Sequence, residues 1–535
     1  MASAKRTSSG PSTAAPSRLR TILTTLFPTP AEIWEAKLGF ALSILSAIVF
    51  RFAYWPYHWS PLALVALVPL LWGIRRCRPT LAFWVALPFA AIMGYVFTGG
   101  ITIVDRFNSM VWWGVVPLAI WVGAHTAMAF ALMIFFGRRL GPWRGAGMAL
   151  LVLAGIEYFR MIGRLALPYG LVSQSMAGWP ALAMVAGVGG LPLLAALVLA
   201  PNLAVMEVIA AVRAGYGQAG AVARLGVAVG AIVLAHFFGT REIAARVSAQ
   251  AAAPGFDYRI ALLQPNIPQE KKFASYTIEN PQERFALQEE MTLQQLQQIG
   301  EIERDEVDLI VTPESSLTQD FMDVEPFLQQ NLYGGAVLEQ VMELATDLRT
   351  PIIVGNVDNV FADAEGNATE KLSEGLMPDG NTFRSGQKVY GATWIIRPNE
   401  PELRPNADYR KVKLMPFGEA VPYFDLIPGF QEKIVQVGTF ARGRNSGPIG
   451  IPLSDDDGAP AAKLGLSICF EDLFPDHHRI HAANGANLFV NTTNDGWFDG
   501  SSIPAWHMEM ARWRSIEFGI PMVRCTNTGI TALID

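Results

Sequence analysis

Three residues in the carboxyl-terminal half of the chain have side chains that could perform acyl-transfer chemistry together. Cys469 lies in the segment LGLSICFEDLFPD, where an apolar run ends and acidic residues begin. Glu314 follows the apolar run DLIVTP, and Lys411 lies in YRKVKLMPFGEAVPY between two segments expected to be extended. A carboxylate can take the proton of a thiol, and an ammonium group can stabilise the oxyanion that forms when the thiolate attacks a carbonyl group. These residue types therefore predict a cysteine nucleophile that needs no histidine base.

Each of these residues also has a structural interpretation. A free cysteine is commonly an inert residue of a buried core, and Cys469 taken alone indicates little more. A glutamate after a strand is commonly the capping partner of a helix, and a lysine between extended segments is commonly solvated at the surface. The combination of all three residue types favours a catalytic site over these interpretations.

From Asp257 onward, short apolar runs alternate with polar helical segments. The runs RIALLQPN, DLIVTPES, PIIVGNVD, KLGLSICFED and NLFVNTTND are typical of buried strands, and the helix-period segment NPQERFALQEEMTLQQLQQIGEIE separates the first two. Strand–helix–strand order predicts parallel strands in an α/β sheet, which binds ligands at the carboxyl ends of its strands. The polar residues expected at that edge are Gln264, Asn266, Glu314, Asn356, Cys469, Glu471, Asn491 and Asn494.

The first half of the chain has the composition of a membrane protein. Apolar residues make up 51% of the 535 residues and charged residues only 16%, against about 25% in a typical soluble protein. Acidic residues are scarce before residue 240. Apolar stretches close to the roughly 20 residues that cross a bilayer predict a helical membrane bundle of about seven spans over residues 36–240. These stretches are 36–54, 60–74, 80–98, 110–136, 146–160, 180–210 and 221–240.

Basic residues at the ends of these stretches predict the orientation, because loops rich in lysine and arginine remain in the cytoplasm. Thirteen basic residues lie on the side that includes the tail 1–35, against six on the other side. The thirteen are Lys5, Arg6, Arg18, Arg20, Lys37, Arg75, Arg76, Arg78, Arg138, Arg139, Arg144, Arg213 and Arg224, and the six are Arg51, Arg106, Arg160, Arg164, Arg241 and Arg246. The tail is therefore expected to be basic, disordered and cytoplasmic, and residues 241–535 are expected to lie outside the cytoplasm. Glu157, Arg160 and Arg164 lie at and just after the end of the fifth stretch and favour an interfacial helix whose arginines extend to the membrane surface; a headgroup or substrate contact is the alternative.

Composition and spacing argue against several other kinds of protein. The net charge of −6 argues against nucleic acid as a partner, because a phosphate-binding surface should be basic. Three scattered cysteines are too few for a disulfide framework. His477, His478 and His481 lack a further ligand at clear spacing, so we expect no metal, and no cofactor-binding loop is predicted.

The order Glu314, Lys411 and Cys469 resembles the Glu-Lys-Cys triad of the carbon–nitrogen hydrolase, or nitrilase, superfamily. Together with the membrane half, the segments QPNIPQEKKF, PFGEAVP and NTTNDGWFDGSSIPAWHMEMARWRSIEFGIPMVRCTNTGITALID resemble the bacterial apolipoprotein N-acyltransferases over most of residues 36–535. This resemblance implies a multi-pass α-helical membrane bundle followed by an α/β nitrilase-like domain, an αββα sandwich, over residues 241–535. The family continues beyond the position of Asp535, so the domain is expected to be truncated at its carboxyl-terminal end.

The resemblance also implies a role for each matching residue. Glu314 matches the base, Lys411 the group that stabilises the oxyanion, and Cys469 the nucleophile. Glu419 and Glu471 match further acidic residues that line such sites.

Aromatic residues of this chain partly depart from the family pattern. Trp497 and Phe273 match positions of aromatic residues near the acyl chain or lid. Phe273 and Thr312 stand where tryptophan is common, and Phe470 stands where tyrosine often follows the nucleophile. The phenylalanines keep the bulk of a ring but lose an N–H or hydroxyl donor, so we expect an effect on substrate fit more than on the reaction.

The function implied by the resemblance is transfer of an acyl chain from a phospholipid to the α-amine of a lipoprotein's diacylglyceryl cysteine, through a thioester on Cys469. Both substrates are held in the bilayer, and the implied location is the bacterial inner membrane with the catalytic domain on the periplasmic side. Two alternatives remain open: a membrane-tethered amidase that uses water as acceptor, and a catalytically silent scaffold that binds lipoproteins. Loss of Cys469 would abolish either enzymatic activity and leave a scaffold function intact.

Overall fold

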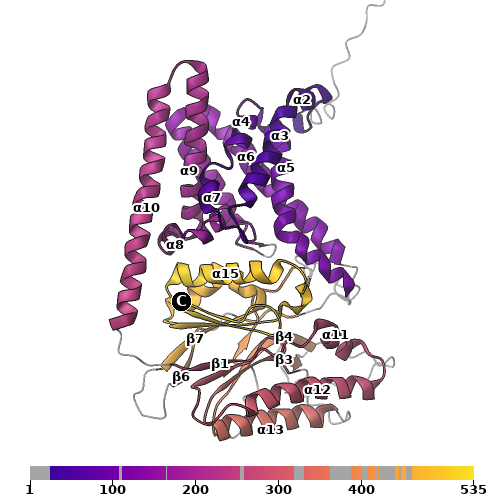
Figure 1. Cartoon of the computed structure of the whole chain (residues 1–535). Coiled ribbons are helices and arrows are strands. Elements are labelled where there is room, and N and C mark those ends of the chain that lie inside the picture. Colours follow the sequence, from indigo (N-terminus) through magenta and orange to yellow (C-terminus); the bar gives the residue numbers. More distant parts are fainter. Residues whose placement is uncertain are drawn as a thin grey trace, which may run out of the picture.

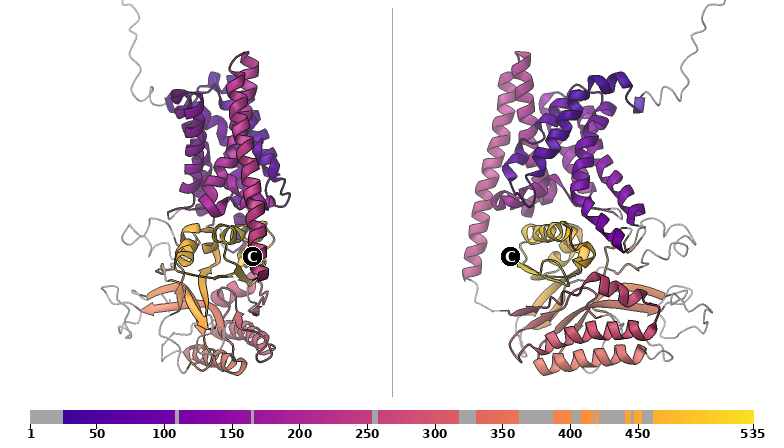
Figure 2. Two further views of the ribbon diagram at one scale, coloured as in Figure 1. Left: turned by 90° about the vertical axis from the view of Figure 1, so that its left-hand side faces the viewer. Right: turned by 45° about the vertical axis from the view of Figure 1, so that its right-hand side comes forward.

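The chain folds as a helical bundle followed by a domain of two β-sheets (Figure 1). The computed structural model describes residues 25–107, 111–163, 166–252, 258–317, 330–361, 387–400, 407–416, 418–420, 440–444, 447–452 and 461–535. Two further views show the bundle at one end of the molecule and the sheets at the other, with the long helix α10 (Gln218–Ala252) running alongside both (Figure 2).

The apolar amino-terminal region forms helices whose ends follow from local sequence signals. Proline begins α5 (Pro79–Thr98) and α7 (Pro142–Phe159), at a position where its missing N–H would have no helical partner. Gly215 ends α9 (Ala186–Ala214) in the left-handed conformation that glycine adopts readily. The other elements of this region are α2 (Pro30–Glu35), α3 (Lys37–Arg51), η1 (Ser60–Leu64), α4 (Val68–Ile74), η2 (Gly99–Arg106), α6 (Val111–Leu140), η3 (Val172–Gly178) and α8 (Pro180–Ala183).

Each of the seven predicted membrane stretches contains a helix. Within the described part of the chain, four helical segments are long and apolar enough to cross a membrane. These are Pro79–Arg106, Val115–Leu140, Ala186–Ala214 and Gln218–Ala249. The number of spans beyond these four stays a prediction.

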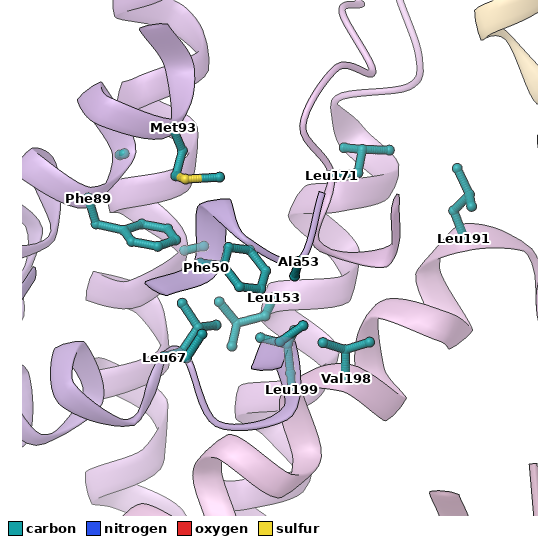
Figure 3. Packing of buried hydrophobic residues seen from close by; sticks show 14 of the residues in the cluster. Phe50, Ala53, Leu67, Phe89, Met93, Leu153, Leu171, Leu191, Val198 and Leu199 are labelled. Carbon is teal, nitrogen blue, oxygen red and sulfur yellow. The ribbon is translucent and has the colours of Figure 1, made fainter. Parts of the chain in front are cut away.

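The bundle encloses one continuous apolar core. Phe50, Leu67, Phe89, Leu153 and Leu199 come from different segments of the chain and are buried together (Figure 3). The rings of Phe50 and Phe89 lie 6.0 Å apart between centroids. Because side chains in such a core are close-packed, their contacts fix the positions of the helices relative to one another.

Glu157 and Arg160 are buried inside the protein and do not extend to its surface. Both are 6% exposed, and they form an ion pair of 4.0 Å inside the bundle. Arg160 also donates hydrogen bonds to the backbone carbonyl groups of Tyr169 and Gly170. The prediction of an arginine that extends to the surface is therefore wrong for Arg160, because the loop after α7 folds back and supplies buried acceptors. Arg164 lies outside the described residues.

Two boundaries of the bundle differ from the sequence-based prediction. α2 occupies the last residues of the tail that was predicted to be disordered, and residues 1–24 lie outside the described part of the chain. α10 continues to Ala252, past the predicted boundary between residues 240 and 241. Its charged extension is compatible with a helix, since Glu242 and Arg246 form an ion pair of 3.0 Å one turn apart.

The carboxyl-terminal half forms two sheets, each with five strands among the described residues, in the orders β1-β2-β3-β4-β5 and β10-β9-β8-β7-β6. Parallel pairing joins β1 to β2 to β3 and β7 to β8 to β9, and the other neighbours are antiparallel. The strands are β1 (Ile260–Leu262), β2 (Leu309–Val311), β3 (Ile352–Phe361), β4 (Gln387–Ile396), β5 (Tyr409–Arg410), β6 (Ile449–Pro452), β7 (Ala461–Ile468), β8 (Leu488–Thr493), β9 (Met522–Thr526) and β10 (Ala532–Ile534). The helical elements are α11 (Gln269–Thr277), α12 (Pro281–Gly300), α13 (Gln330–Leu348), η6 (Cys469–Leu473), α14 (Pro475–Ala483), η7 (Asp495–Phe498) and α15 (Ile503–Phe518).

Alternation of side chains along the strands builds a sandwich of four layers. Leu309 of β2 belongs to the core between the two sheets, whereas its neighbour Ile310 packs with residues of α12 and α13. Val490 of β8 also belongs to the core between the sheets, whereas Phe489 packs with residues of α15. Successive strand residues point to opposite faces of a sheet. The predicted αββα sandwich is therefore confirmed.

The sandwich rests against the bundle through α15 (Figure 1). Trp506 of α15 packs edge-to-face on Phe97 and Tyr54, with ring centroids 4.7 and 6.0 Å apart. Phe470 and Phe474, from the segment after β7, belong to the same apolar cluster as the bundle core. This shared core brings the carboxyl end of β7 to the junction of the two halves.

Candidate active site

Cys469 occupies a sharp turn at the carboxyl end of β7. The strand ends at Ile468, and η6 begins with Cys469, whose φ angle is +51°. This left-handed conformation is unfavourable for a residue with a side chain, so neighbouring contacts have to hold it. Asn491 of β8 provides one such contact, because its Nδ2 donates to the carbonyl oxygen of Cys469 at 3.2 Å and to Oγ of Ser467 at 3.1 Å. Cys469 itself stays partly exposed.

Lys411 bridges two carboxylates near this turn. Its Nζ donates to Oε1 of Glu314 at 3.1 Å and to Oε1 of Glu419 at 2.6 Å. The lysine side chain is 1% exposed, whereas those of Glu314 and Glu419 retain 17% and 21%. The ammonium group is thus fixed between two carboxylates that remain partly open to solvent.

The turn that carries Glu314 packs directly on β3. A Cβ atom added to Gly355 would lie 2.2 Å from the carbonyl oxygen of Pro313 and 2.9 Å from Cα of Glu314, so only glycine permits this approach. The backbone N–H of Ser316 donates to the carbonyl oxygen of Gly355 at 2.8 Å and fixes the turn. The predicted strand end at Asn356 is wrong, because β3 continues past it in antiparallel pairing with β4.

Glu471 is a fully buried clamp between β5 and β7. Its Oε1 accepts hydrogen bonds from the backbone N–H groups of Val412 and Lys413 at 2.6 and 2.7 Å. Its Oε2 accepts from the N–H of Ile468 at 2.8 Å and from the hydroxyl of Tyr409 at 2.5 Å. The carboxylate therefore ties the segment that carries Lys411 to the segment that carries the cysteine, which favours a supporting role over substrate contact.

A closed ring of buried charges lies next to the cysteine turn. His507 bonds to Asp472 at 2.9 Å and to Asp495 at 2.7 Å, and Arg524 bonds to the same two aspartates. Arg524 also donates to Oδ1 of Asn491 at 2.9 Å, which orients the amide that holds the cysteine turn. Burial and Arg524 lower the pKa of His507, but the two aspartates raise it more, to about 9. His507 is therefore a cation that links Asp472 to Asp495, as expected of an imidazole between two carboxylates.

Burial and nearby charges set the protonation states at the site. Burial raises the pKa of Cys469 well above its usual value; the charge of Glu314 raises it further, and Lys411 acts in the opposite direction. Burial lowers the pKa of Lys411, but the charges of Glu314, Glu419 and Cys469 raise it more, to well above its usual value. The resting site therefore holds a neutral thiol and an ammonium group, so that a base has to take the thiol proton during reaction.

Phe273 and Trp497 meet a ring from the bundle. Phe107, directly after η2, lies 5.7 Å from Phe273 and 5.4 Å from Trp497 between ring centroids, and the latter two are 6.3 Å apart. The adjacent Arg106 donates to the carbonyl oxygen of Gly496 at 3.3 Å. Sequence alone gives no signal for Phe107, because nothing in the local pattern relates the end of an apolar stretch to a turn 390 residues later.

Phe470 packs away from this aromatic cluster. It is buried in the apolar cluster shared with the bundle, where its ring lies edge-to-face with that of Phe474 at 5.0 Å. Its contacts are apolar, and they hold the cysteine turn against the bundle.

Other residues predicted at the strand ends contact neighbouring loops. Gln264 donates to the backbone of the β9–β10 loop at 3.1 Å, and Asn494 donates to Oε1 of Gln269 at 2.9 Å. The backbone N–H of Asn266 donates to the carbonyl oxygen of Asn527 at 3.0 Å. These contacts support the loops that surround the site.

The bundle reaches the neighbourhood of the cysteine. Tyr169, in the loop between α7 and η3, is buried, and burial together with the charges of Asp472, Asp495 and Cys469 raises its pKa. Cys469 packs at the edge of the apolar cluster that fills the bundle. The site therefore lies where the sandwich meets the bundle.

Comparison with known protein families gives two matches. The carbon-nitrogen hydrolase model matches residues 259–535, which is more than half of the chain. The chain belongs to the carbon-nitrogen hydrolase family. Residues 46–204 of the helical bundle match the apolipoprotein N-acyltransferase N-terminal domain.

Similar curated proteins match the chain along most of its length. The apolipoprotein N-acyltransferase of Geobacter metallireducens is 26% identical over 504 residues, which cover 93% of this chain and 85% of the relative. The protein of the same name from Gloeobacter violaceus is 26% identical over 493 residues, which cover 90% of this chain and 81% of the relative. Among solved structures, the carbon-nitrogen hydrolase of Helicobacter pylori G27 is 17% identical, covers 45% of this chain and 70% of that chain, and has a TM-score of 0.28, too low to support an argument about geometry.

Proposed function

We propose that the chain is an apolipoprotein N-acyltransferase that moves an acyl chain from a phospholipid to the α-amine of a diacylglyceryl-cysteine lipoprotein. The observation that carries the proposal is the position of Cys469, a partly exposed residue at the edge of an apolar cluster continuous with the bundle. A donor can present its ester there while its chains stay in apolar surroundings. Keeping an acyl chain out of water avoids a cost of about 0.8 kcal/mol per methylene. The curated relatives of this name support the assignment.

In the first half-reaction, Glu314 takes the proton of Cys469, and the thiolate attacks the ester carbonyl carbon of the phospholipid. Lys411, which Glu314 and Glu419 hold in place through hydrogen bonds, stabilises the oxyanion that forms. Collapse of this intermediate breaks the ester C–O bond, and the leaving lysophospholipid oxygen receives the proton from Glu314. The products are a thioester on Cys469 and a lysophospholipid.

In the second half-reaction, the neutral α-amine of the lipoprotein attacks the thioester carbonyl carbon. Glu314 accepts a proton from the attacking nitrogen, the C–S bond breaks, and Cys469 leaves as a thiolate that Glu314 then protonates, which restores the carboxylate. The product is an amide on the lipoprotein. Since one product leaves before the second substrate reacts, ping-pong kinetics are expected.

The catalytic domain is proposed to lie on the periplasmic side of the inner membrane. Arginines predicted to be cytoplasmic gather together, because Arg75 and Arg213 contact the same tryptophan ring and Arg138 donates to the carbonyl oxygen of Arg75. Arginines predicted on the opposite side contact the sandwich instead: Arg51 lies over a tryptophan ring of α15, and Arg106 bonds to η7. This separation supports the orientation derived from the excess of basic residues in cytoplasmic loops.

Intact-mass spectrometry of the full chain after incubation with phospholipid vesicles tests the proposal. We expect a mass gain of one acyl chain that hydroxylamine removes and that Cys469→Ala lacks. Addition of a diacylglyceryl-cysteine peptide should discharge the adduct and acylate the peptide amine. Absence of any adduct on folded protein would refute the proposal.

Two alternative functions give different products in the same experiment. A membrane-tethered amidase would discharge the thioester to water, so that free fatty acid would accumulate whether or not the peptide is present. A silent scaffold would bind the lipopeptide equally well with Cys469 or with alanine in its place and would form no adduct.

A further inference from the structure

A second buried lysine, Lys272, lies beside the proposed base. It belongs to α11 and is 3% exposed. Its Nζ donates to the carbonyl oxygen of Ser315, the residue after Glu314, at 2.7 Å. Burial of an ammonium group is costly, and a single carbonyl oxygen does not offset this cost. Nearby negative charge therefore has to stabilise Lys272, and Glu314 is the carboxylate whose charge acts on it.

The backbone after Glu314 needs external support. Ser315 has a φ angle of +47°, in the left-handed region that is unfavourable for serine. On one side, Lys272 binds the carbonyl oxygen of Ser315; on the other, the backbone of Ser316 is bonded to Gly355 of β3. The turn that carries Glu314 is thus held between α11 and β3.

Lys272 also balances the negative charge of the two carboxylates at the site. Lys411 is shared between Glu314 and Glu419, so two carboxylates face one ammonium group there. Lys272 supplies a second positive charge, and the sum over both lysines, both glutamates and the neutral thiol of Cys469 is then zero. Burial lowers the pKa of Lys272 to about 8, with Glu314 acting in the opposite direction, so that Lys272 is mainly protonated at neutral pH.

We propose that Lys272 is a positioning residue for Glu314: it holds the turn that carries Glu314 through the Ser315 carbonyl group and adds a second positive charge next to the two carboxylates. This inference rests on the proposed function, in which Glu314 takes the proton of Cys469. That transfer moves one proton from Sγ to a carboxylate oxygen and leaves the net charge of the site at zero. A base that is ionised before the substrate arrives accepts the proton over a wider range of acidic pH.

The neighbouring Lys271 provides a matched control. It lies on the same helix but binds Glu290 of α12 at 2.8 Å, on the partly exposed side of α11. Glu270 of the same helix faces Arg106 of η2 at 3.4 Å. Among the described residues, the titratable groups around the base are therefore Lys272 on α11 and Lys411, Glu419 and Cys469 across the site.

The inference is tested by the rate at which iodoacetamide alkylates Cys469. The full chain is placed in lipid nanodiscs at a series of acidic to neutral pH values, and alkylation is followed by intact-mass spectrometry. The rate should fall as Glu314 becomes protonated. In Lys272→Met the midpoint of this fall should move up by about one pH unit, the size expected when a carboxylate loses a nearby cation. Lys271→Met should leave the midpoint unchanged, and Lys272→Arg, which keeps the charge, should also keep it. Cys469→Ala gives the background from the two buried cysteines.

A midpoint in Lys272→Met equal to that of the unsubstituted chain would overturn the inference, as would an equal shift in Lys271→Met. Should Lys272→Met not fold, Lys272→Gln, which removes the charge but keeps a hydrogen-bond donor, takes its place: a raised midpoint would support the role of the charge, and an unchanged one would overturn it. Glu314→Gln has to remove the midpoint and leave a rate that falls steadily with pH, as expected of a thiol that has lost its base; a retained midpoint would show that another group is being titrated. Alkylation needs no acyl donor, so failure to form an acyl thioester would count against the proposed function and not against this inference.

Discussion

Glu471→Gln removes one ionic acceptor from the clamp that joins β5 and β7. Four donors converge on the carboxylate: the N–H groups of Val412, Lys413 and Ile468 and the hydroxyl of Tyr409. Glutamine has nearly the same shape, but its amide nitrogen can only donate. Either pair of donors must therefore face an NH2 group, and the first consequence is a less stable sandwich.

The size of the effect follows from the hydrogen bonds that cannot form. If the amide oxygen serves Val412 and Lys413, the NH2 group faces the N–H of Ile468, while the hydroxyl of Tyr409 can rotate to accept. One buried N–H without an acceptor costs about 1–3 kcal/mol, and loss of the ionic acceptor weakens the remaining bonds by about 1 kcal/mol in total. The sum is about 3 kcal/mol, which for a domain of this size lowers Tm by about 6–12 °C.

Thermal unfolding in detergent measures this loss of stability. Unfolding is detected when buried Cys525 becomes accessible and reacts with a thiol-reactive fluorophore. The matched control is Glu419→Gln, because the Glu419 side chain is partly exposed and binds Lys411. The control should lose thioester formation with a much smaller change in Tm. A Tm of Glu471→Gln within about 2 °C of the unsubstituted chain, less than the shift for 1 kcal/mol, would refute the reasoning.

Three further perturbations test the supports of the site. Asn491→Leu removes the amide that holds the Cys469 carbonyl oxygen, and thioester formation measured by intact mass should slow by at least about tenfold, since misplaced reacting groups are costly. The pKa of His507 is raised from 6.5 to about 9 on folding. Its stabilising contribution is therefore complete below pH 6.5 and is lost as the pH rises through 9. Melting curves across this range should show a fall in Tm that His507→Gln lacks. Gly355→Ala would force its Cβ into the turn that carries Glu314, so acylation should be nearly abolished; a fully active variant would show that the turn tolerates displacement.

Local patterns in the sequence predicted a helical half followed by an α/β half, whereas the αββα sandwich was implied by the family resemblance. The apolar stretches predicted a helical region, and the apolar runs after residue 257 predicted strands because hydrophobic periodicity reflects which faces are buried. The types and order of Glu314, Lys411 and Cys469 indicated a candidate site before any geometry was known. The strand end at Asn356 was misplaced, because an apolar run followed by a polar residue looks the same whether or not pairing with another strand continues.

The supports of the site were decided by tertiary structure. Lys272 resembles its neighbour Lys271 in the sequence, and only packing determines that one binds Ser315 while the other binds Glu290. Phe107 joins the aromatic residues near the site only because the bundle docks on the sandwich. Contacts between distant segments depend on how whole elements pack, whereas periodicity and residue type are local properties. The sequence by itself therefore determined the elements and the candidate chemistry, and the fold decided which groups hold that chemistry in place.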